Sequence, residues 1–572
     1  MTDVLDRLTA PAEQLEQRLG PADDPANPYG FAAAARRDDA GAYPDELAAA
    51  LRSTGFHLDY LPAGMGGTFA SFDRSMLLVR AAARRDLNAM PATMFSITAA
   101  TCVRLHGSAA QQAQVAGLLR AGGAVAFALS EAEHGSDLLA NTTRLVPDPA
   151  GGGGHLLTGE KWMVGLGQRC DAAYVVARTG ERGPGSFTAV LLDLVTAGPG
   201  LDRGAPVPAG GMRGIDFAHL RFDRLPVAAE QVVGRPGEAL EVAVKAQQVV
   251  RLMSTAGSLG CADTALRLTL GFAAGRRTGR AVLLDTPYQR RELAVASAAL
   301  LAADAVALAA ARGIHAAPEQ FSVWGCAAKH VVAESVEDAI ARCGATLATR
   351  AVLRAEGPGG GLFQKLQRDA ALVRVVDTST LANLRSFSGQ LPALARAGAV
   401  TADEDRARAV FALDAPLPPY DPARLDLNAR GRDLPTGTLG AVAAPAAAAL
   451  AEGGAPAVAA LAEQLHAGLL ALPAEAERAR PGNELVDLAE RFAWLQAGAC
   501  CLQLWWASRH LPLYGQKPGS ASWLGACLAY LLARADGRPP RREADLLAPA
   551  LDTVLDLTAA GRMYAAAPAA LA

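Results

Sequence analysis

The sequence lacks the features of several large protein classes. Its 54 Lys and Arg residues are balanced by 57 Asp and Glu, a formal net charge of -3, so it has no basic excess of the kind that nucleic-acid binding usually requires. None of its eight cysteines forms a C-x-x-C pair, which disfavours a zinc ribbon or a disulfide framework. Because scattered single cysteines are typical of a reducing compartment, we expect a cytoplasmic location.

Long uninterrupted apolar runs are also missing. No uncharged apolar run reaches the roughly 18–20 residues that span a bilayer, so no transmembrane segment is expected. The N-terminus, MTDVLDRLTAPAEQLEQRL, has no apolar region of the kind found in secretory signals. Aromatic residues make up only 5% of the chain, and its 51% hydrophobic share is rich in Ala and Leu, which favour helix. This composition predicts a mainly helical globular protein.

The residue pattern changes character several times along the chain. Up to about Asp39 it is typical of a linker interrupted by prolines. Apolar residues at three- and four-residue spacing then predict an N-terminal helical domain over residues 40–123. Short β-rich pieces between Gly, Pro and Asp turns, from AVAFALS to AHLRFDRLPV, predict a small antiparallel barrel or sandwich over residues 124–235.

Helical periodicity returns in the second half of the sequence. Long, weakly interrupted stretches predict an antiparallel helical bundle over residues 236–400. A Pro-rich joint, Leu413–Leu427, indicates an interdomain linker, and a further Ala- and Leu-rich helical domain is expected over residues 428–566. The expected fold is therefore mainly α, with a central small β domain and an additional C-terminal helical domain.

Two short motifs in the β region carry candidate binding residues. The loop Leu129–Asp137 follows the first β piece, and its glycine lets backbone N–H groups approach a ligand, with Ser130 and Ser136 as small donors. A polar loop that caps a strand is the alternative. Further on, Trp162 either stacks on a planar ligand or belongs to the core. His134 lies near two glutamates, but such a loop needs a further ligand from elsewhere, so no metal site is expected.

Two more motifs lie in the helical bundle. The basic segment Gly275–Arg280 at the end of a long helix either complements the helix dipole or holds a pyrophosphate. In the segment Arg368–Thr380, Asp377 follows two valines and precedes three hydroxyl residues. It is either a helix N-cap or a base.

In this order on a helical–β–helical chain, the four motifs resemble those of the acyl-CoA dehydrogenase family. The family pattern T-E-P-x-x-G-S-D is matched by Ser130–Asp137, and G-x-K-x-W-[IV]-T is partly matched by Gly159–Gly165 with the tryptophan one place early. The ending R-D-A…E-G-T is matched by Arg368–Ser379. The resemblance covers roughly residues 43–398, and the C-terminal region resembles the extra domain of longer family members.

The resemblance implies a flavoprotein with FAD between the β domain and the helical bundle, in a homodimer or homotetramer. The implied substrate is an acyl-CoA or an acyl group on an acyl carrier protein, and the electron acceptor is open. Asp377 falls where the family has its catalytic glutamate. The positions implied to contact FAD are Leu129, Ser130, Trp162, Met163, Gly165, Arg276, Thr278, Thr378, Ser379 and Thr380, and those implied to contact substrate are Ser136 and Arg251.

The implied chemistry is desaturation of an acyl thioester. A base removes the α-proton while the β-hydrogen leaves as a hydride, and a carboxylate suits the first task when substrate excludes water and raises its basicity. Some family branches place the base on the long helix, but Val250 occupies that position here and cannot titrate. Asp377 is therefore the candidate base.

Several positions depart from the family pattern. Asp377 is one methylene shorter than glutamate, a loss of reach of about 1.5 Å in a step where a misplacement near 1 Å is costly. Gly165 stands where a Thr near flavin N5 is usual, and the arginine of R-x-x-F-G is displaced to Arg276. The segment Ala341–Leu347 lacks the Gln and two glycines of Q-x-x-G-G-x-G, and Gly357–Gly361 is an insertion.

These departures keep two other functions open. A flavin-dependent oxidase or monooxygenase on the same fold would tolerate a looser base geometry. A redox-silent family member would have lost FAD through the changes at Gly275–Gly279 and Ala341–Leu347.

Overall fold

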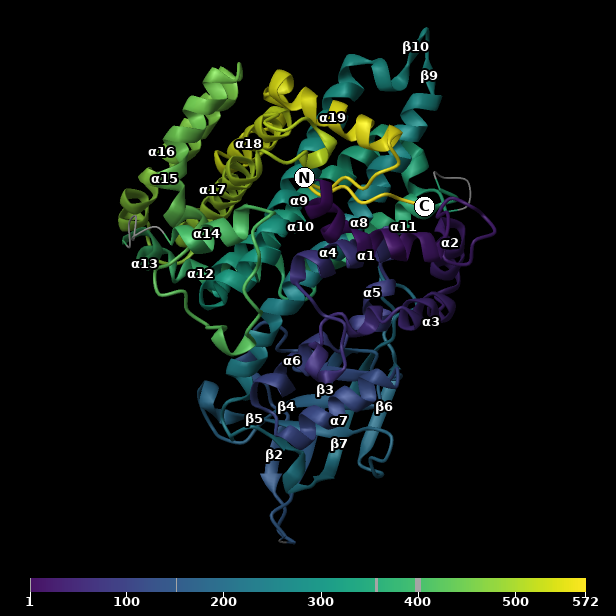
Figure 1. Cartoon of the computed structure of the whole chain (residues 1–572). Coiled ribbons are helices and arrows are strands. Elements are labelled where there is room, and N and C mark those ends of the chain that lie inside the picture. Colours follow the sequence, from purple (N-terminus) through teal and green to yellow (C-terminus); the bar gives the residue numbers. More distant parts are fainter. Residues whose placement is uncertain (1, 151, 355–358, 397–402) are drawn as a thin grey trace. The chain divides into compact units, whose positions relative to one another are not determined.

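The computed structural model describes residues 2–150, 152–354, 359–396 and 403–572, so Gly357 and Pro358 of the expected insertion lie outside the described residues. The chain forms two compact units (Figure 1). The β-containing unit comprises residues 36–70 and 88–250, and the helical unit comprises residues 1–35, 71–87 and 251–572. The boundaries of the four expected domains stay a prediction.

The β-containing unit is built on a mixed sheet. Seven of its strands follow the order β6-β7-β3-β2-β4-β5-β8, and β1 pairs with β4 off this path. The strands are β1 (Val125–Ala128), β2 (Arg144–Pro147), β3 (His155–Gly165), β4 (Ala172–Arg178), β5 (Phe187–Asp193), β6 (Leu201–Pro206), β7 (Phe217–Val227) and β8 (Val232–Val233).

The sheet confirms most of the expected β pieces and corrects one feature. Strands β1 to β5 and β7 lie where the sequence predicts strands. The sequence pattern does not predict β6 or the two-residue β8, because neither shows a clear alternation of apolar and polar residues. The purely antiparallel arrangement is wrong for β1, which runs parallel to β4. The reason is that the chain passes through the β2–β3 hairpin before it returns beside β1.

Four short helices accompany the sheet within the same unit. Gln111 on α7 donates from its side-chain Nε2 to the carbonyl oxygens of Glu230 and Val232, at 2.9 Å each, and so ties this helix to the end of the sheet. Ser108 and Gln111 form a capping box that starts α7. The helices are α3 (Asp45–Ser53), α5 (Ala89–Met94), α6 (Ile97–His106) and α7 (Ala109–Arg120).

The helical unit is organised around α9 (Pro287–Ala316), which is buried from Glu292 to Ala316. Its Ala-rich sequence lets neighbouring helices pack closely, and at Gly313 even a Cβ would lie 2.3 Å from the ring of Trp324. The other helices are α1 (Thr2–Leu19), α4 (Phe72–Ala83), α10 (Phe321–Leu347), α11 (Leu362–Val375), α12 (Thr380–Ser388), α13 (Leu391–Arg396), α14 (Glu404–Phe411), α15 (Leu434–Glu452), α16 (Pro456–Arg478), α17 (Asn483–Ser508), α18 (Ser522–Ala535) and α19 (Ala544–Ala559).

Two further helices, α2 (Phe31–Ala40) and α8 (Ala239–Gly275), each contain a boundary between the units. Within the helical unit α8 packs closely on α4, because Gly260 has no side chain: a Cβ there would lie 2.8 Å from the Arg84 amide nitrogen. A short hairpin of β9 (Arg277–Thr278) and β10 (Ala281–Val282) follows α8.

Among the described residues, α9, α15 and α16 are long and apolar enough to cross a membrane by length and composition. Charged residues interrupt α9 and α16, whereas residues 434–451 of α15 are uncharged but contain threonine, glycine and proline. The apolar window of α9 is 100% buried, so its hydrophobicity is accounted for by its place in the bundle, whereas 44% and 28% of the windows of α15 and α16 are buried.

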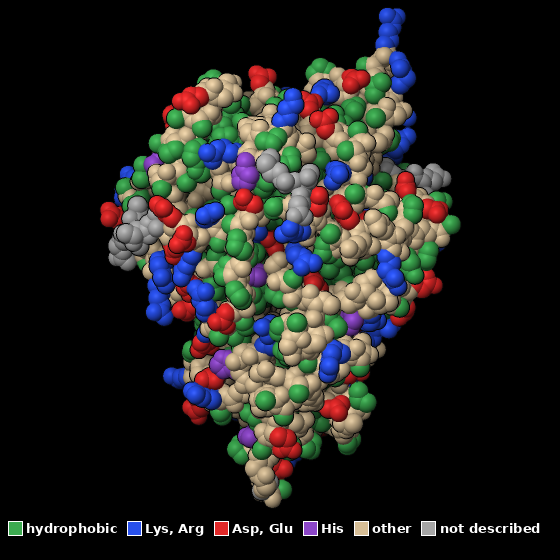
Figure 2. All heavy atoms as spheres, in the orientation of Figure 1, with side chains coloured by type: hydrophobic (Ala, Val, Ile, Leu, Met, Phe, Trp, Pro, Cys, Tyr) green, Lys and Arg blue, Asp and Glu red, His purple; other side chains and the backbone are tan. Residues whose placement is uncertain are grey.

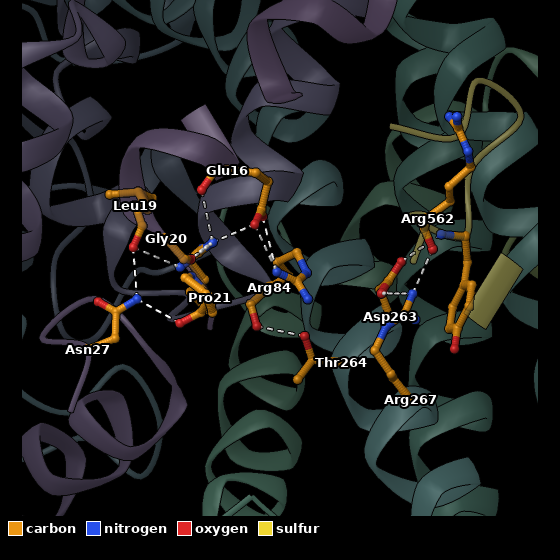
Figure 3. Close-up of polar contacts among 12 residues, drawn as sticks. Glu16, Leu19, Gly20, Pro21, Asn27, Arg84, Asp263, Thr264, Arg267 and Arg562 are labelled. Carbon is orange, nitrogen blue, oxygen red and sulfur yellow. Dashed lines mark hydrogen bonds and ion pairs between the residues drawn. The ribbon is translucent and has the colours of Figure 1, made fainter. Parts of the chain in front are cut away.

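The first 39 residues are not a linker. They form α1 and most of α2, because Leu8, Leu15 and Leu19 give α1 an apolar face that is buried in the helical unit. Figure 3 shows the polar part of this anchor, in which Glu16 lies against the guanidinium of Arg84. Glu16 also pairs with Arg85, and all three side chains are buried.

The C-terminal segment is fastened to the same unit. The backbone N–H groups of Tyr564 and Ala566 donate to the carboxylates of Asp263 at 2.8 Å and Asp304 at 2.7 Å, and Arg80 donates to the Tyr564 carbonyl at 2.6 Å. Arg267 donates to the carbonyl of Arg562 nearby (Figure 3). Two buried carboxylates and one buried guanidinium group thus bind backbone groups of the C-terminal segment.

The Pro-rich joint Leu413–Leu427 is also held in place. Arg312 on α9 donates to the carbonyl oxygens of Ala412, at 3.0 Å, just before the joint, and Ala415, at 2.9 Å, within it. The ring of His315 contacts the Pro418 carbonyl at 3.0 Å through Nδ1. The joint therefore behaves as part of the bundle surface rather than as a free tether.

We predict that Glu16→Ala lowers the free energy of unfolding by about 3 kcal/mol, because it leaves two buried guanidinium groups without their carboxylate. Urea unfolding followed by circular dichroism measures the change. The exposed Asp23→Asn is the matched control and should shift stability by less than about 0.5 kcal/mol. Equal stability of the two variants would contradict the anchoring role of Glu16.

Candidate functional site

The loop after β1 is pinned by a buried ion pair. Lys161 on β3 is 0% exposed, and its Nζ donates to the Leu129 carbonyl at 2.9 Å and to Glu131 Oε1 at 3.0 Å. Glu131 also accepts from the backbone N–H groups of Thr142 at 2.7 Å and Thr143 at 2.9 Å. The loop that carries Leu129 and Ser130 is thus fixed to two neighbouring strands.

The electrostatics of this pair follow from burial and mutual attraction. Burial opposes the charge of Glu131, but Lys161 and the backbone donors outweigh it and lower its pKa to about 2. Burial lowers the pKa of Lys161 to about 8, although Glu131 acts in the opposite direction. Both groups are engaged in the hydrogen bonds that hold the loop, so neither is a candidate for proton transfer.

Trp162 lies beside this loop on a β-bulge. Its backbone N–H donates to the Ser130 carbonyl at 3.0 Å, and its side chain is 38% exposed. The register between β3 and β7 shifts from Lys161 to Val164, and Met163 within the bulge has a φ of 52°. Trp162 is therefore not a core residue, and its backbone lies next to that of Ser130.

Gly165 ends β3 directly against an aromatic ring. A Cβ at this position would lie 2.3 Å from Phe95 Cζ, so no side chain fits. Phe95 follows α5 and packs edge-on against Phe217, with ring centroids 6.1 Å apart. Sequence reasoning missed Phe95, because nothing in its local pattern distinguishes it from other apolar residues.

Asp377 lies in a cationic environment within the helical unit. It follows α11 and is half-buried. Burial raises its pKa, while the charges of Lys329 and Arg251 and a hydrogen bond with Ser254 act in the opposite direction. The carboxyl is thus a stronger base than an ordinary aspartate.

Lys329 on α10 is the central group of this cluster, and sequence reasoning missed it as well. It is 0% exposed, and its Nζ donates to the Val373 carbonyl at 2.7 Å and to Ser254 Oγ at 3.1 Å. Burial lowers its pKa to about 8, while Asp377 raises it. Lys329 therefore joins α8, α10 and the end of α11 around the carboxylate.

The residues after Asp377 adopt a strained turn. Asp377 has a φ of 54° and Thr378 a φ of 75°, a region that costs non-glycine residues about 1–3 kcal/mol. Arg251 Nη2 donates to Thr378 Oγ1 at 3.0 Å, and Asn383 donates to the carbonyl oxygens of Thr378 at 3.0 Å and Ser379 at 3.1 Å. These bonds hold the turn against its strain.

The N-cap of α12 is Ser379, whose Oγ accepts from the Ala382 N–H at 3.2 Å. The alternative in which Asp377 is the helix cap is therefore excluded. Thr380, the first residue of α12, is buried. The carboxyl of Asp377 is left to interact with Lys329 and Arg251 instead.

The remaining candidate positions are exposed. Ser136 lies on a bend after the β1 loop. Arg276 and Thr278 lie on the hairpin β9–β10, whose tip is covered by basic side chains in Figure 2. The segment Ala341–Leu347, where the resemblance implies a glycine-rich loop, instead continues α10 as regular helix. Loss of the glycines lets the helix propagate.

Two descriptions of one family match the chain over these elements: "Acyl-CoA dehydrogenase, middle domain" over residues 126–225 and "Acyl-CoA dehydrogenase, C-terminal domain" over residues 237–378. These matches assign residues 126–225 and 237–378 of the chain to the acyl-CoA dehydrogenase family. Probable acyl-CoA dehydrogenase FadE25 of Mycobacterium tuberculosis is 27% identical over 247 residues, which cover 43% of this chain. The match spans 62% of the length of FadE25.

Solved structures share the fold. Butyryl-CoA dehydrogenase from Megasphaera elsdenii superposes with a TM-score of 0.60 at 22% identity and covers 68% of this chain and 98% of its own. The prolyl acyl carrier protein oxidase AnaB has a TM-score of 0.59 at 17% identity, with the same coverage. The mainly helical fold with a small β domain and additional C-terminal helices is thereby confirmed.

Acyl-CoA dehydrogenases generally bind FAD. In the β-containing unit the side chain of Trp162 is 38% exposed, and its backbone N–H donates to the carbonyl of the half-buried Ser130. In the helical unit Val375 and Leu381, on either side of Asp377, are 57% and 60% exposed. An exposed indole of this kind suits contact with a planar ring.

No group of three or more His, Cys, Asp and Glu side chains placed to hold a metal ion occurs in the part of the chain that the structure describes. His134 and Glu131 therefore do not form such a cluster. Glu131 is committed to Lys161.

We predict that Glu131→Gln changes the acid stability of the protein. The folded carboxylate stays charged down to pH about 2 and the unfolded one takes up its proton near pH 4.5, so the stability it contributes is complete above 4.5 and is lost as pH falls towards 2. This contribution is about 3 kcal/mol.

Unfolding free energies measured in urea from pH 7 downwards test this expectation. Glu131→Gln should be less stable than the parent at pH 7 but lose less stability on acidification. The exposed neighbour Glu133 supplies the control Glu133→Gln, which should follow the parent at every pH. A parent-like acid dependence of Glu131→Gln would contradict the assignment.

Proposed function

We propose that the chain is an FAD-dependent oxidoreductase that desaturates the Cα–Cβ bond of an acyl thioester, with Asp377 as the base. The observation that carries the proposal is the environment of Asp377: a half-buried carboxyl with a raised pKa, not used as a helix cap. Family membership and the exposed surfaces around Ser130 and Asp377 support it.

The proposed reaction divides between the protein and its cofactor. FAD, when bound, takes up the β-hydrogen together with its electron pair. Asp377 takes the α-proton, and the two electrons of the Cα–H bond form the new Cα–Cβ double bond. The proton and the hydride together account for the two hydrogens removed.

The surrounding residues prepare Asp377 for this step. Burial raises the pKa of Asp377 and so makes it a better proton acceptor, while the charge of Lys329 acts against this rise and favours the carboxylate. Arg251 fixes the turn through its hydrogen bond to Thr378. The backbone of Asp377 therefore has a defined conformation, which restricts where its side chain can lie. Ser130 and Trp162 would hold the edge and face of the flavin ring.

Other parts of the proposal rest on the family pattern. Arg276 and Thr278 would meet the FAD of a second subunit, which agrees with their exposure on the β9–β10 hairpin, in a homodimer or homotetramer. The carrier is CoA or an acyl carrier protein. All eight cysteines are free and buried, which supports a location in the reducing cytoplasm.

We predict that Asp377→Asn abolishes thioester oxidation while flavin remains bound, because the amide cannot accept the α-proton. The measurement is anaerobic bleaching of the flavin absorbance on mixing with acyl-CoA or acyl carrier protein substrates. We expect a loss of at least about a thousandfold in the bleaching rate. Unchanged bleaching would remove Asp377 from its role.

The same experiment separates the alternatives. A colourless purified protein that takes up no added FAD would indicate the redox-silent function. Bleaching by thioester followed by rapid reoxidation in air would indicate an oxidase, and bleaching that requires a nicotinamide would indicate a monooxygenase.

We further predict that Lys329→Met shifts the acid limb of the kcat/KM profile to higher pH. The cation lowers the pKa of Asp377, so its removal raises that pKa and the base becomes protonated at higher pH. Lys329→Arg, which keeps the charge, is the control. A merely structural role would lower activity at all pH values without moving the limb.

A further inference from the structure

The helical unit contains a cavity of about 390 Å³ between α13, α15, α16 and α17. Leucines form its apolar part, with Leu394, Leu434, Leu469 and Leu472 joined by Phe492, and the rest of the lining is largely polar or glycine. Leu470, also part of the lining, is 68% exposed. A volume of this size is within the range of small-molecule sites, which are mostly apolar with a few polar groups.

Some polar groups of the lining have hydrogen-bond or ion-pair partners within the protein, and others do not. Asp433 accepts from Gln496 Nε2 at 2.6 Å and from the Thr436 N–H at 3.2 Å, so it is fully engaged. Arg406 pairs with Glu319 at 2.7 Å and with Asp403 at 3.0 Å. The charge of Arg406 is therefore balanced by two carboxylates, whereas the partners of Asp433 are neutral groups.

Three other lining residues have no such partners in the described chain. Arg432 is exposed and His466 half-buried, and the side chain of neither makes a hydrogen bond or an ion pair. Gln320 is only 5% exposed, yet its Oε1 is buried without a hydrogen-bond partner. A buried polar atom without a partner costs about 1–3 kcal/mol, which a ligand or water relieves.

The cavity is separate from the family core. Apart from Gln320, every lining residue lies beyond residue 378, where the family match ends. None belongs to α8, to the Asp377 loop or to the sheet. The cavity is therefore a feature of the added C-terminal helices, and its role is independent of the reaction proposed above.

We propose that this cavity binds a single alkyl chain ending in a carboxylate, such as a fatty-acid anion of medium length. The chain lies against the leucines and Phe492, where burial of apolar surface contributes about 25 cal/mol per Å². The carboxylate meets Arg432 and His466, the two basic side chains that the protein leaves without acidic partners. Gln320 supplies a further hydrogen-bonding group at the wall.

Two glycines on α15 make the proposal testable without disturbing the core. Gly437 and Gly440 both line the cavity; a Cβ at Gly437 meets nothing within 4 Å, and one at Gly440 lies 3.9 Å from His466 Nε2. Because Gly437 is within a helix, replacing it costs no backbone strain. Gly437→Phe places a ring in the cavity, and Gly437→Ala is the matched control that leaves it open.

The experiment is calorimetric titration of the full-length flavin-loaded protein with decanoate. We expect saturable binding that weakens at least about tenfold in Gly437→Phe and less than about twofold in Gly437→Ala. No binding to the parent protein, or binding that Gly437→Phe leaves unchanged, would overturn the proposal. Equal unfolding midpoints of the two variants show that the loss is not a folding defect.

The head group is tested separately. In the double variant Arg432→Gln, His466→Gln, decanoate should bind about tenfold more weakly, because charge-assisted hydrogen bonds are lost, while 1-decanol binds as before. An equal loss for both ligands would overturn the carboxylate assignment. Bleaching of the flavin by thioester should be unchanged in Gly437→Phe, so failure of this site and failure of the proposed reaction are distinguishable.

Discussion

The interaction on which the Asp377 region depends is the buried charge of Lys329. A fully buried ammonium requires neighbouring acceptors, and α8 and α11 supply them through Ser254 and Val373, while Asp377 contributes a favourable negative charge. The same charge acts against the rise that burial causes in the pKa of Asp377. One side chain thus links three helices and modulates the basicity of the carboxyl, while Arg251 and Asn383 hold the turn.

Two substitutions involving glycine and threonine distinguish this chain from the family pattern. At position 378 a threonine replaces the family's glycine and keeps a φ of 75° because Arg251 and Asn383 hold it. At position 165 a glycine replaces the usual threonine because Phe95 fills the space of a side chain. Both changes lie beside candidate site residues, where a strained backbone or a close ring is tolerated because the surrounding contacts fix it.

Regions outside the family match are built into the helical unit rather than appended to it. Glu16 joins α1 to the end of α4, and Asp263, Asp304 and Arg80 bind the backbone of the C-terminal segment. With α14, α17, α18 and α19 packed around it, α9 is buried along nearly its whole length. This burial explains why a helix inside a globular bundle has the composition of a membrane span.

The sequence by itself determined the family, the helical–β–helical order and the position of Asp377, because short motifs and apolar periodicity are local properties that survive in a single chain. It could not reveal α1 as a packed helix, since the Pro-rich stretch after it resembles a linker, nor the parallel pairing of β1, which depends on a partner far along the chain.

Lys329, Phe95 and the turn at Thr378 were decided by tertiary structure alone. Each acts through a neighbour at least 70 residues away in the sequence (Ser254, Gly165 and Arg251), and burial, close approach and charge pairing between such residues have no signature in a local pattern.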